Sequence, residues 1–166
     1  LWDNSASPPV ITDSLFQSNA VESRGGAIYR EANYSGPAFT DAFLLEVRDS
    51  AFIGNSAEDD GGAIYYDPSW NNESESAELE LRVIDSEFIG NSSHDAGGAI
   101  ETDASGGVAG TPVLSITGSR FERNFGYGSS SGGVIEWDAS VSSPNVGRIE
   151  IRDTTIDSNA GGEGGT

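Results

Sequence analysis

The chain has 166 residues, of which 27 are Asp or Glu and 8 are Lys or Arg, and its formal net charge is -19. A charge of this size excludes nucleic acid and anionic membrane surfaces as partners, because both would repel the chain. The sequence contains no cysteine, which excludes a disulfide scaffold, a thiol nucleophile and a cysteine-ligated metal centre. No apolar run approaches the roughly 20 residues that span a bilayer, so no transmembrane segment is predicted.

One phrase recurs along the chain. In its first copy an apolar strand precedes Asp-Ser at 13–14, and Phe16 and Asn19 form the pattern Phe-x-x-Asn. The tetrapeptide Gly-Gly-Ala-Ile follows at 25–28. Later copies of the first part cover 47–55, 83–91, 116–124 and 151–159, and later copies of the glycine part cover 61–64, 97–100 and 132–135. A fixed period of this kind indicates a repeat architecture, with repeats at about 11–46, 47–82, 83–115, 116–150 and 151–166.

Each repeat predicts short strands. In the third repeat Leu79, Leu81 and Val83 alternate with charged residues, and a period of two is typical of a half-buried strand. Turns at Asp-Ser, at Asn and at Gly-Gly separate this strand from a Phe-centred and an Ile-centred strand. Three short strands in a period of about 35 residues predict an all-β fold, a right-handed parallel β-helix of about five coils. We expect residues 1–166 to be one segment of a longer solenoid.

Stacked coils convert repeated residues into columns, because adjacent strands lie about 4.8 Å apart. We predict an apolar column made of Phe16, Phe52, Phe88 and Phe121. We also predict a structural ladder of side-chain amides made of Asn19, Asn55, Asn91, Asn124 and Asn159. The same alignment places Glu46 beside Arg82 on adjacent coils, where the opposite charges attract each other.

Aspartates form a further predicted column, in which Asp13, Asp49 and Asp85 recur once per coil. Like charges at this spacing repel unless backbone donors or a cation neutralise them. A calcium site at Asp49 and Asp85 is therefore left open, beside the alternative of a diffuse cloud of counterions. We predict no other cofactor, and a single His without Cys does not favour a transition-metal centre.

The combination of Phe-x-x-Asn with Gly-Gly-Ala-Ile, repeated in phase from Ile11 to Thr166, resembles the polymorphic outer membrane protein repeats of chlamydial autotransporter adhesins. The resemblance implies a β-helix of the autotransporter passenger type, located outside the cell or on its surface. It implies adhesion, assembly or structural display as the function, and no catalytic residues. The expected partners are a protein or glycan at a surface, or further coils or copies of the same solenoid.

An enzyme is the alternative interpretation, because polysaccharide lyases and hydrolases also use β-helices. The sequence gives it little support, since Lys is absent and the single histidine, His94, has no flanking glycines. The pairs Asp59-Asp60 and Arg148-Ile149 match only fragments of a polygalacturonase pattern. We therefore predict a non-enzymatic module, with a carbohydrate-active enzyme or a glycan-binding module as the alternative.

Variable segments separate the repeats at 29–41, 65–77, 101–111 and 136–147. Rigid solenoids generally display such insertions on one side. Aromatic residues at or near the beginnings of these segments predict a binding surface made of Tyr29, Tyr65, Tyr66, Trp70 and Trp137. The alternative interpretation is that they cap the flank of the helix.

Overall fold

The computed structural model describes residues 9–31, 43–68, 78–104, 111–128, 132–138 and 147–162. In these ranges the chain is all-β, and its strands form four parallel sheets, which confirms the predicted fold class. Sheet A contains β1 (Val10–Thr12), β5 (Phe43–Arg48), β9 (Glu78–Ile84), β13 (Thr111–Thr117) and β17 (Arg148–Arg152). Sheet B contains β2 (Leu15–Gln17), β6 (Ala51–Ile53), β10 (Glu87–Ile89), β14 (Arg120–Glu122) and β18 (Thr155–Asp157).

The strands of sheet C are shorter, and sheet D has fewer strands. Sheet C contains β3 (Ala20–Val21), β7 (Ser56–Ala57), β11 (Ser92–Ser93), β15 (Phe125–Gly126) and β19 (Ala160–Gly161). Sheet D contains β4 (Ile28–Glu31), β8 (Ile64–Asp67), β12 (Ile100–Asp103) and β16 (Ile135–Asp138). Within the described ranges four coils have a strand in every sheet and a fifth contributes β17, β18 and β19, slightly fewer complete coils than the five predicted.

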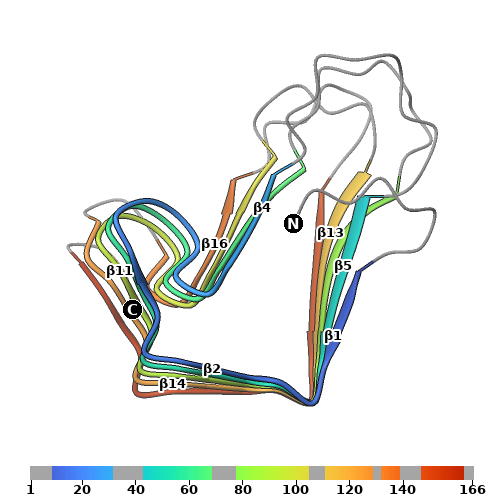
Figure 1. The fold of residues 1–166 in the computed structure, drawn as a ribbon. Coiled ribbons are helices and arrows are strands. Elements are labelled where there is room, and N and C mark those ends of the chain that lie inside the picture. Colours follow the sequence, from blue (N-terminus) through green and yellow to red (C-terminus); the bar gives the residue numbers. More distant parts are fainter. Residues whose placement is uncertain are drawn as a thin grey trace.

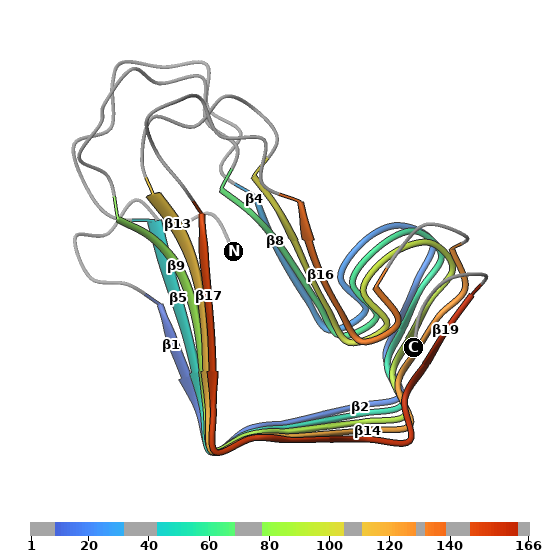
Figure 2. The ribbon, with the colours of Figure 1, turned by 180° about the vertical axis from the view of Figure 1, so that it is seen from behind.

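Each sheet forms one wall of the solenoid, and the chain visits sheets A, B, C and D in turn (Figures 1 and 2). In Figure 1 the chain runs clockwise as it passes from the near blue coil to the distant red coil, so the solenoid is right-handed. This is the hand that right-twisted parallel strands favour.

The phenylalanine column lies on the core-facing side of sheet B. Strand register pairs Phe16 with Phe52, Phe52 with Phe88, and Phe88 with Phe121. The ring centroids of these three pairs are 4.8, 4.7 and 4.7 Å apart, and the ring planes are within 5° of parallel. This separation equals the spacing of neighbouring strands, so the backbone register alone brings identical rings into contact. Ile156 pairs with Phe121 in the fifth coil.

The asparagine ladder occupies the turn between sheets B and C. The side-chain oxygen of Asn91 accepts hydrogen bonds from the backbone N–H and the Nδ2 of Asn55, both at 3.0 Å. In turn Asn91 donates from Nδ2 to the Phe52 carbonyl at 3.0 Å and to Oδ1 of Asn124 at 2.9 Å. The same pattern joins Asn19 to Asn55 and Asn124 to Asn159. Each interior amide therefore satisfies buried polar groups of both neighbouring coils.

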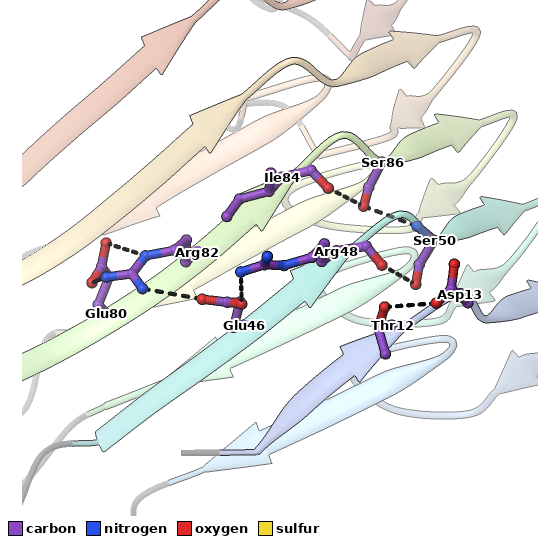
Figure 3. Close-up of polar contacts among 9 residues, drawn as sticks. All are labelled: Thr12, Asp13, Glu46, Arg48, Ser50, Glu80, Arg82, Ile84 and Ser86. Atoms are coloured by element: carbon purple, nitrogen blue, oxygen red, sulfur yellow. Dashed lines mark hydrogen bonds and ion pairs between the residues drawn. The ribbon is translucent and has the colours of Figure 1, made fainter. Parts of the chain in front are cut away.

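A second ladder, made of hydroxyl groups, runs along the corner between sheets A and B (Figure 3). The Ser50 backbone N–H donates to the Ser86 hydroxyl at 3.2 Å, and Ser50 Oγ donates to the Arg48 carbonyl at 2.7 Å. Equivalent bonds link the corner residues Ser14, Ser50, Ser86, Ser119 and Thr154 in order. The corner residues that the sequence indicates as a turn therefore have a second role, because their hydroxyl groups connect successive coils.

Glycines are required where coils meet most closely. The first glycine of the first three Gly-Gly pairs has a left-handed backbone, with φ of 64° at Gly61, which favours a residue without Cβ. The second glycine has no room for a side chain, since a Cβ at Gly62 would lie 2.1 Å from the carbonyl oxygen of Gly98 on the next coil. The tetrapeptide therefore fixes both the turn and the coil-to-coil distance.

The core lies between sheets A, B and D. Sheet A contributes alternate residues such as Leu45, Val47 and Leu81, which are at most 2% exposed. Sheet D contributes the predicted isoleucine positions, with Ile64 and Ile100 fully buried. Because each inward residue rests on its equivalent in the next coil, a narrow core suffices for a chain with few large apolar residues.

Ion pairs cover the outer face of sheet A. Register pairs Glu46 with Arg82 as the sequence alignment predicts, and Arg82 Nη1 lies 3.0 Å from a Glu46 carboxylate oxygen. Arg82 also pairs with Glu80, and Glu46 with Arg48 (Figure 3). These guanidinium groups are over 40% exposed, so each pair contributes at most about 1 kcal/mol.

Candidate functional site

The two faces of sheet D carry different chemistry. Residues 64 and 66 of β8 face the core, where the Tyr66 hydroxyl donates to the Phe43 carbonyl at 2.5 Å. Residues 65 and 67 face the opposite side, because successive side chains of a strand alternate. On that side register aligns four residues in one row, Tyr29, Tyr65, Glu101 and Glu136. We call this row the sheet D strip.

The first half of the strip is aromatic. The Tyr29 and Tyr65 rings are stacked, with centroids 5.4 Å apart and planes within 9° of parallel. Tyr29 is 42% exposed, whereas Tyr65 is fully buried. Burial, followed by the charges of Asp67 and Asp103, raises the pKa of Tyr65, so its hydroxyl stays protonated and donates hydrogen bonds.

Arg24 supplies the positive charge for this half. It lies in the connection from sheet C to sheet D, directly before the first glycine of the Gly-Gly pair. Its Nε lies 2.9 Å from a carboxylate oxygen of Asp60, and its Nη1 donates to the Tyr65 hydroxyl at 3.0 Å. The guanidinium carbon also lies 4.9 Å from the centre of the Tyr65 ring. Carboxylate, phenol and aromatic face thus contact one guanidinium group, whose side chain remains 42% exposed.

The second half of the strip is acidic. Glu101 is only 7% exposed, and its burial, followed by the negative charges of Asp60, Glu136 and Asp103, raises its pKa to about 9. A hydrogen bond joins the Glu101 and Asp60 side chains. Burial also raises the pKa of Asp60, although the charge of Arg24 opposes the rise. At neutral pH the Glu101–Asp60 pair therefore holds a proton, which resides on Glu101.

One oxygen of Glu101 is unsatisfied. Its Oε2 is buried and has no hydrogen-bond partner in the structure. The neighbouring Glu136 differs, because its Oε2 accepts from the backbone N–H of Gly132 at 2.8 Å. A buried polar atom without a partner costs about 1 to 3 kcal/mol of stability. Glu101 Oε2 therefore lacks the hydrogen-bond donor that would offset this cost.

The structure separates the residues of the predicted aromatic surface. Tyr29 and Tyr65 lie together on the strip, whereas Tyr66 is 2% exposed in the core and Trp137 packs against the core from β16. Trp70 lies outside the described residues. The structure thus brings two of the five predicted residues together and adds acidic neighbours that sequence reasoning did not select.

The aspartate column lies at the outer corner between sheets A and B. Asp13, Asp49 and Asp85 have positive φ, from 46° to 49°, a conformation that Asp tolerates better than most residues. The column is interrupted at Gly118, where a Cβ would lie 2.0 Å from Oδ1 of Asp85. Across the described parts of the chain, no group of three or more His, Cys, Asp or Glu side chains is arranged to hold a metal ion. Calcium at Asp49 and Asp85 stays a prediction.

Two segments of the chain match a family of known proteins. Residues 49–67 and 85–103 each match the family profile of the Chlamydia polymorphic membrane protein repeat. Each match runs from a corner aspartate, through Phe-x-x-Asn and Gly-Gly-Ala-Ile, to the end of a sheet D strand. No curated protein and no solved structure matches the chain. Within the described ranges no helix has the length and apolar character needed to cross a membrane.

The two matches lie 36 residues apart and cover successive coils of the solenoid, so the repeat of the family corresponds to one turn of the fold. These two segments are therefore similar to the Chlamydia polymorphic membrane protein repeat, as the resemblance in the sequence predicted.

Proposed function

We propose that this chain is a non-enzymatic adhesive and structural module at the outside of a cell, and that its variable connections hold the partner. The repeat family matched at 49–67 and 85–103 supports a location at a membrane surface. The ladders support a structural role, since the repeated Asn, Ser and Phe side chains contact their own equivalents on neighbouring coils. The part of each coil that repeats within the chain thus builds the scaffold.

The observation that carries the proposal is the common location of the variable connections. Segments 32–42, 69–77, 105–110 and 139–146 lie outside the described residues, but both ends of each are described. Each segment leaves a strand of sheet D and returns to a strand of sheet A. Figure 1 shows these strand ends on one side of the solenoid. The four connections, which differ in sequence, are therefore anchored on one side of the solenoid, at the ends of the sheet D and sheet A strands. This is the usual arrangement for a recognition surface.

The test is adhesion by the purified chain coupled to fluorescent beads. In the matched variant, Gly-Ser linkers of equal length replace all four connections, and circular dichroism and urea unfolding verify that the scaffold is intact. Native beads are expected to bind cultured cells, and the variant beads to bind at least about tenfold less. Equal cell binding by the two bead types would contradict the proposal.

The enzymatic alternative is tested with the same preparation. The chain is incubated with pectin, alginate and hyaluronan, and released reducing ends and unsaturated products are measured. We expect no turnover. Turnover by the native chain that is lost in a Glu101→Gln variant would overturn the non-enzymatic assignment, because Glu101 is the buried, protonated carboxyl group that a general acid requires.

A further inference from the structure

The outer face of sheet C carries aromatic side chains in the third and fourth coils. Ser93 and Gly126 are buried, so their neighbours point outward, because side chains alternate along a strand. Register aligns one outward row made of Ala20, Ser56, Ser92, Phe125 and Ala160. Backbone hydrogen bonds align a second row, two residues further along each coil, made of Glu22, Glu58, His94, Tyr127 and Gly162. We call His94, Phe125 and Tyr127 the sheet C aromatic cluster.

The three rings of the cluster pack together. The ring centroids of Phe125 and Tyr127 are 4.3 Å apart and their planes are inclined by 63°, so the two rings meet edge to face. On the side of the third coil Tyr127 adjoins His94, with centroids 6.1 Å apart and planes inclined by 24°. The backbone N–H of Tyr127 donates to the Ser93 carbonyl at 3.0 Å. Because strand hydrogen bonds hold these rings in place, the cluster is preorganised, which lowers the entropic cost of binding a ligand.

Tyr127 is exposed in a way that its position along the solenoid does not explain. It is 60% exposed. The other large apolar side chains that are exposed in the described residues all belong to the first or the fifth coil, where a strand has one neighbouring strand. Tyr127 lies in the fourth coil and has a coil on either side. A large aromatic side chain that stays exposed there is typical of a binding surface.

The cluster is bordered by small residues on the side of the fifth coil. Register places Ala160 beside Phe125, and Gly162 is aligned with Tyr127. The aligned residue of the fifth coil therefore contributes no side chain over the Tyr127 ring. Phe125 and Tyr127 stand above the surface of Ala160 and Gly162, and the resulting step suits a small ligand with a flat face.

Polar groups adjoin the cluster. Ser92 pairs with Phe125 in register and is partly exposed. Asp95 follows His94 in the chain, Glu58 precedes it by one coil, and both acids are exposed. Hydroxyl and carboxylate oxygens accept hydrogen bonds from alcohol groups. The carboxylates and the net charge of -19 repel anions, so these surroundings exclude an acidic ligand and favour one that carries hydroxyl groups.

We propose that the sheet C aromatic cluster binds a neutral hexopyranose unit of a glycan. A pyranose ring presents C–H groups on one face and hydroxyl groups around its rim, so its face stacks on Tyr127 while its hydroxyl groups bind the adjoining polar residues. This inference goes beyond the proposed function, because sheet C is a different wall from the sheet D and sheet A strand ends that anchor the connections (Figure 1). The chain thus has a second binding surface, which is specific for carbohydrate.

An organic cation fits the cluster less well than a sugar. Aromatic sites for ammonium groups surround the cation with several ring faces. Here the edge-to-face contact closes the space between Phe125 and Tyr127, and His94 adjoins the Tyr127 ring from the third coil. The accessible part is the side of Tyr127 toward Gly162, which accommodates a flat molecule and does not enclose a spherical one.

The experiment is an NMR titration of the folded chain with the methyl glycosides of glucose, galactose and mannose. The control for each glycoside is the corresponding alditol, which has the hydroxyl groups but no ring. We expect at least one glycoside to cause saturable shifts of the backbone amides of β15 and Tyr127, with a dissociation constant of about 1 to 10 mM. Its alditol is expected to bind at least about tenfold more weakly. Saturation of the aromatic protons of the native chain is expected to transfer to C–H protons of one sugar face.

Variants localise the site. Tyr127→Ala is expected to weaken glycoside binding at least about tenfold, whereas Tyr127→Phe keeps the affinity within about twofold, because the ring face and not the hydroxyl group is required. Tyr29→Ala removes the exposed tyrosine of sheet D and is the matched control, which leaves binding unchanged. Urea unfolding verifies that each variant is folded. If Tyr127→Ala fails to fold, the saturation transfer in the native chain carries the test.

Four results would overturn the inference. They are the absence of saturable shifts with all three glycosides up to about 100 mM, equal affinity for glycoside and alditol, native affinity in Tyr127→Ala, and saturation of the same amides by tetramethylammonium chloride at lower concentration than by any glycoside. The bead assay separates this inference from the proposed function. Cell binding that depends on the connections, without glycoside binding at the cluster, would leave the proposed function intact and reject the carbohydrate surface.

Discussion

The asparagine ladder and the sheet D strip are both rows of side chains stacked along the solenoid, but only the ladder repeats its residue. In the ladder, Asn55, Asn91 and Asn124 each donate to and accept from their neighbours, so buried polar groups are satisfied. In the strip the residue changes from Tyr to Glu, and Glu101 is left with an unpaired oxygen. A repeated residue stabilises the fold, whereas the changed residue leaves a buried polar atom without a partner.

The largest effect is expected where two coils are in backbone contact. In Gly62→Ala the new Cβ would lie 2.1 Å from the Gly98 carbonyl oxygen, so the coils must separate, and we expect the free energy of unfolding to fall by at least about 4 kcal/mol. Gly90→Ala is the control, because Gly90 lies inside the Phe-x-x-Asn turn of the third coil and has no heavy atom within 4 Å of the new Cβ. Its left-handed backbone should cost only about 1 to 2 kcal/mol. Equal losses in urea unfolding would contradict the close contact.

Breaking the ladder is the next largest effect. Asn91→Ala removes an acceptor for two Asn55 donors and a donor to two buried oxygens, so a loss of about 3 kcal/mol is expected. Asn19→Ala, at the exposed first position, removes a donor to Asn55 alone and should cost about 1 kcal/mol. Urea unfolding at pH 7 measures both. A loss at Asn19 as large as that at Asn91 would show that the ladder is not cooperative along the axis.

The strip is expected to respond to pH in the opposite way to an ordinary surface carboxylate. The folded state holds the Glu101 proton more tightly than the unfolded state, where the pKa is near 4.5. The contribution of Glu101 to stability is therefore greatest below pH 4.5 and falls as the pH rises toward 9, by at most about 1.4 kcal/mol per pH unit. Glu101→Gln removes this titration and should stabilise the chain at pH 8 by about 1 to 3 kcal/mol. A Gln variant with the native pH dependence would exclude Glu101 as the titrating group.

The smallest effect is expected on the outer face of sheet A. Arg82→Ala removes exposed ion pairs with Glu46 and Glu80, so the unfolding free energy should fall by less than about 1 kcal/mol. The difference from the native chain should nearly vanish in 1 M NaCl, where the screening length is about 3 Å. A loss that persists in high salt would indicate that the arginine stem packs on the sheet.

The scaffold could be predicted from the sequence because its signals repeat. Phe52 and Phe88, or Asn55 and Asn91, recur at the same interval, and a constant interval becomes contact once coils stack. The hydroxyl ladder was missed, since Ser50 and Ser86 are typical turn residues whose contacts become visible only between coils.

Predicting the sheet D strip from the sequence requires the strand register between coils. Tyr66 follows Ile64 by two residues, so the core face predicted for Ile64 already assigns Tyr66 to the core. Aligning the Gly-Gly pairs would also have placed Glu101 next to Tyr65. What no alignment could supply is the burial of Glu101 and its contact with Asp60, because these depend on how the connection from sheet C to sheet D folds over the strip.

The most direct test of the division between scaffold and strip compares two single variants in one experiment. The urea midpoints of Asn91→Ala and Glu101→Gln are measured beside the native chain at pH 8. The ladder makes Asn91 stabilising and the strip makes Glu101 destabilising, so the first midpoint should fall and the second should rise. A lower midpoint for both variants would contradict the account, because Glu101 would then be one more structural residue of the solenoid.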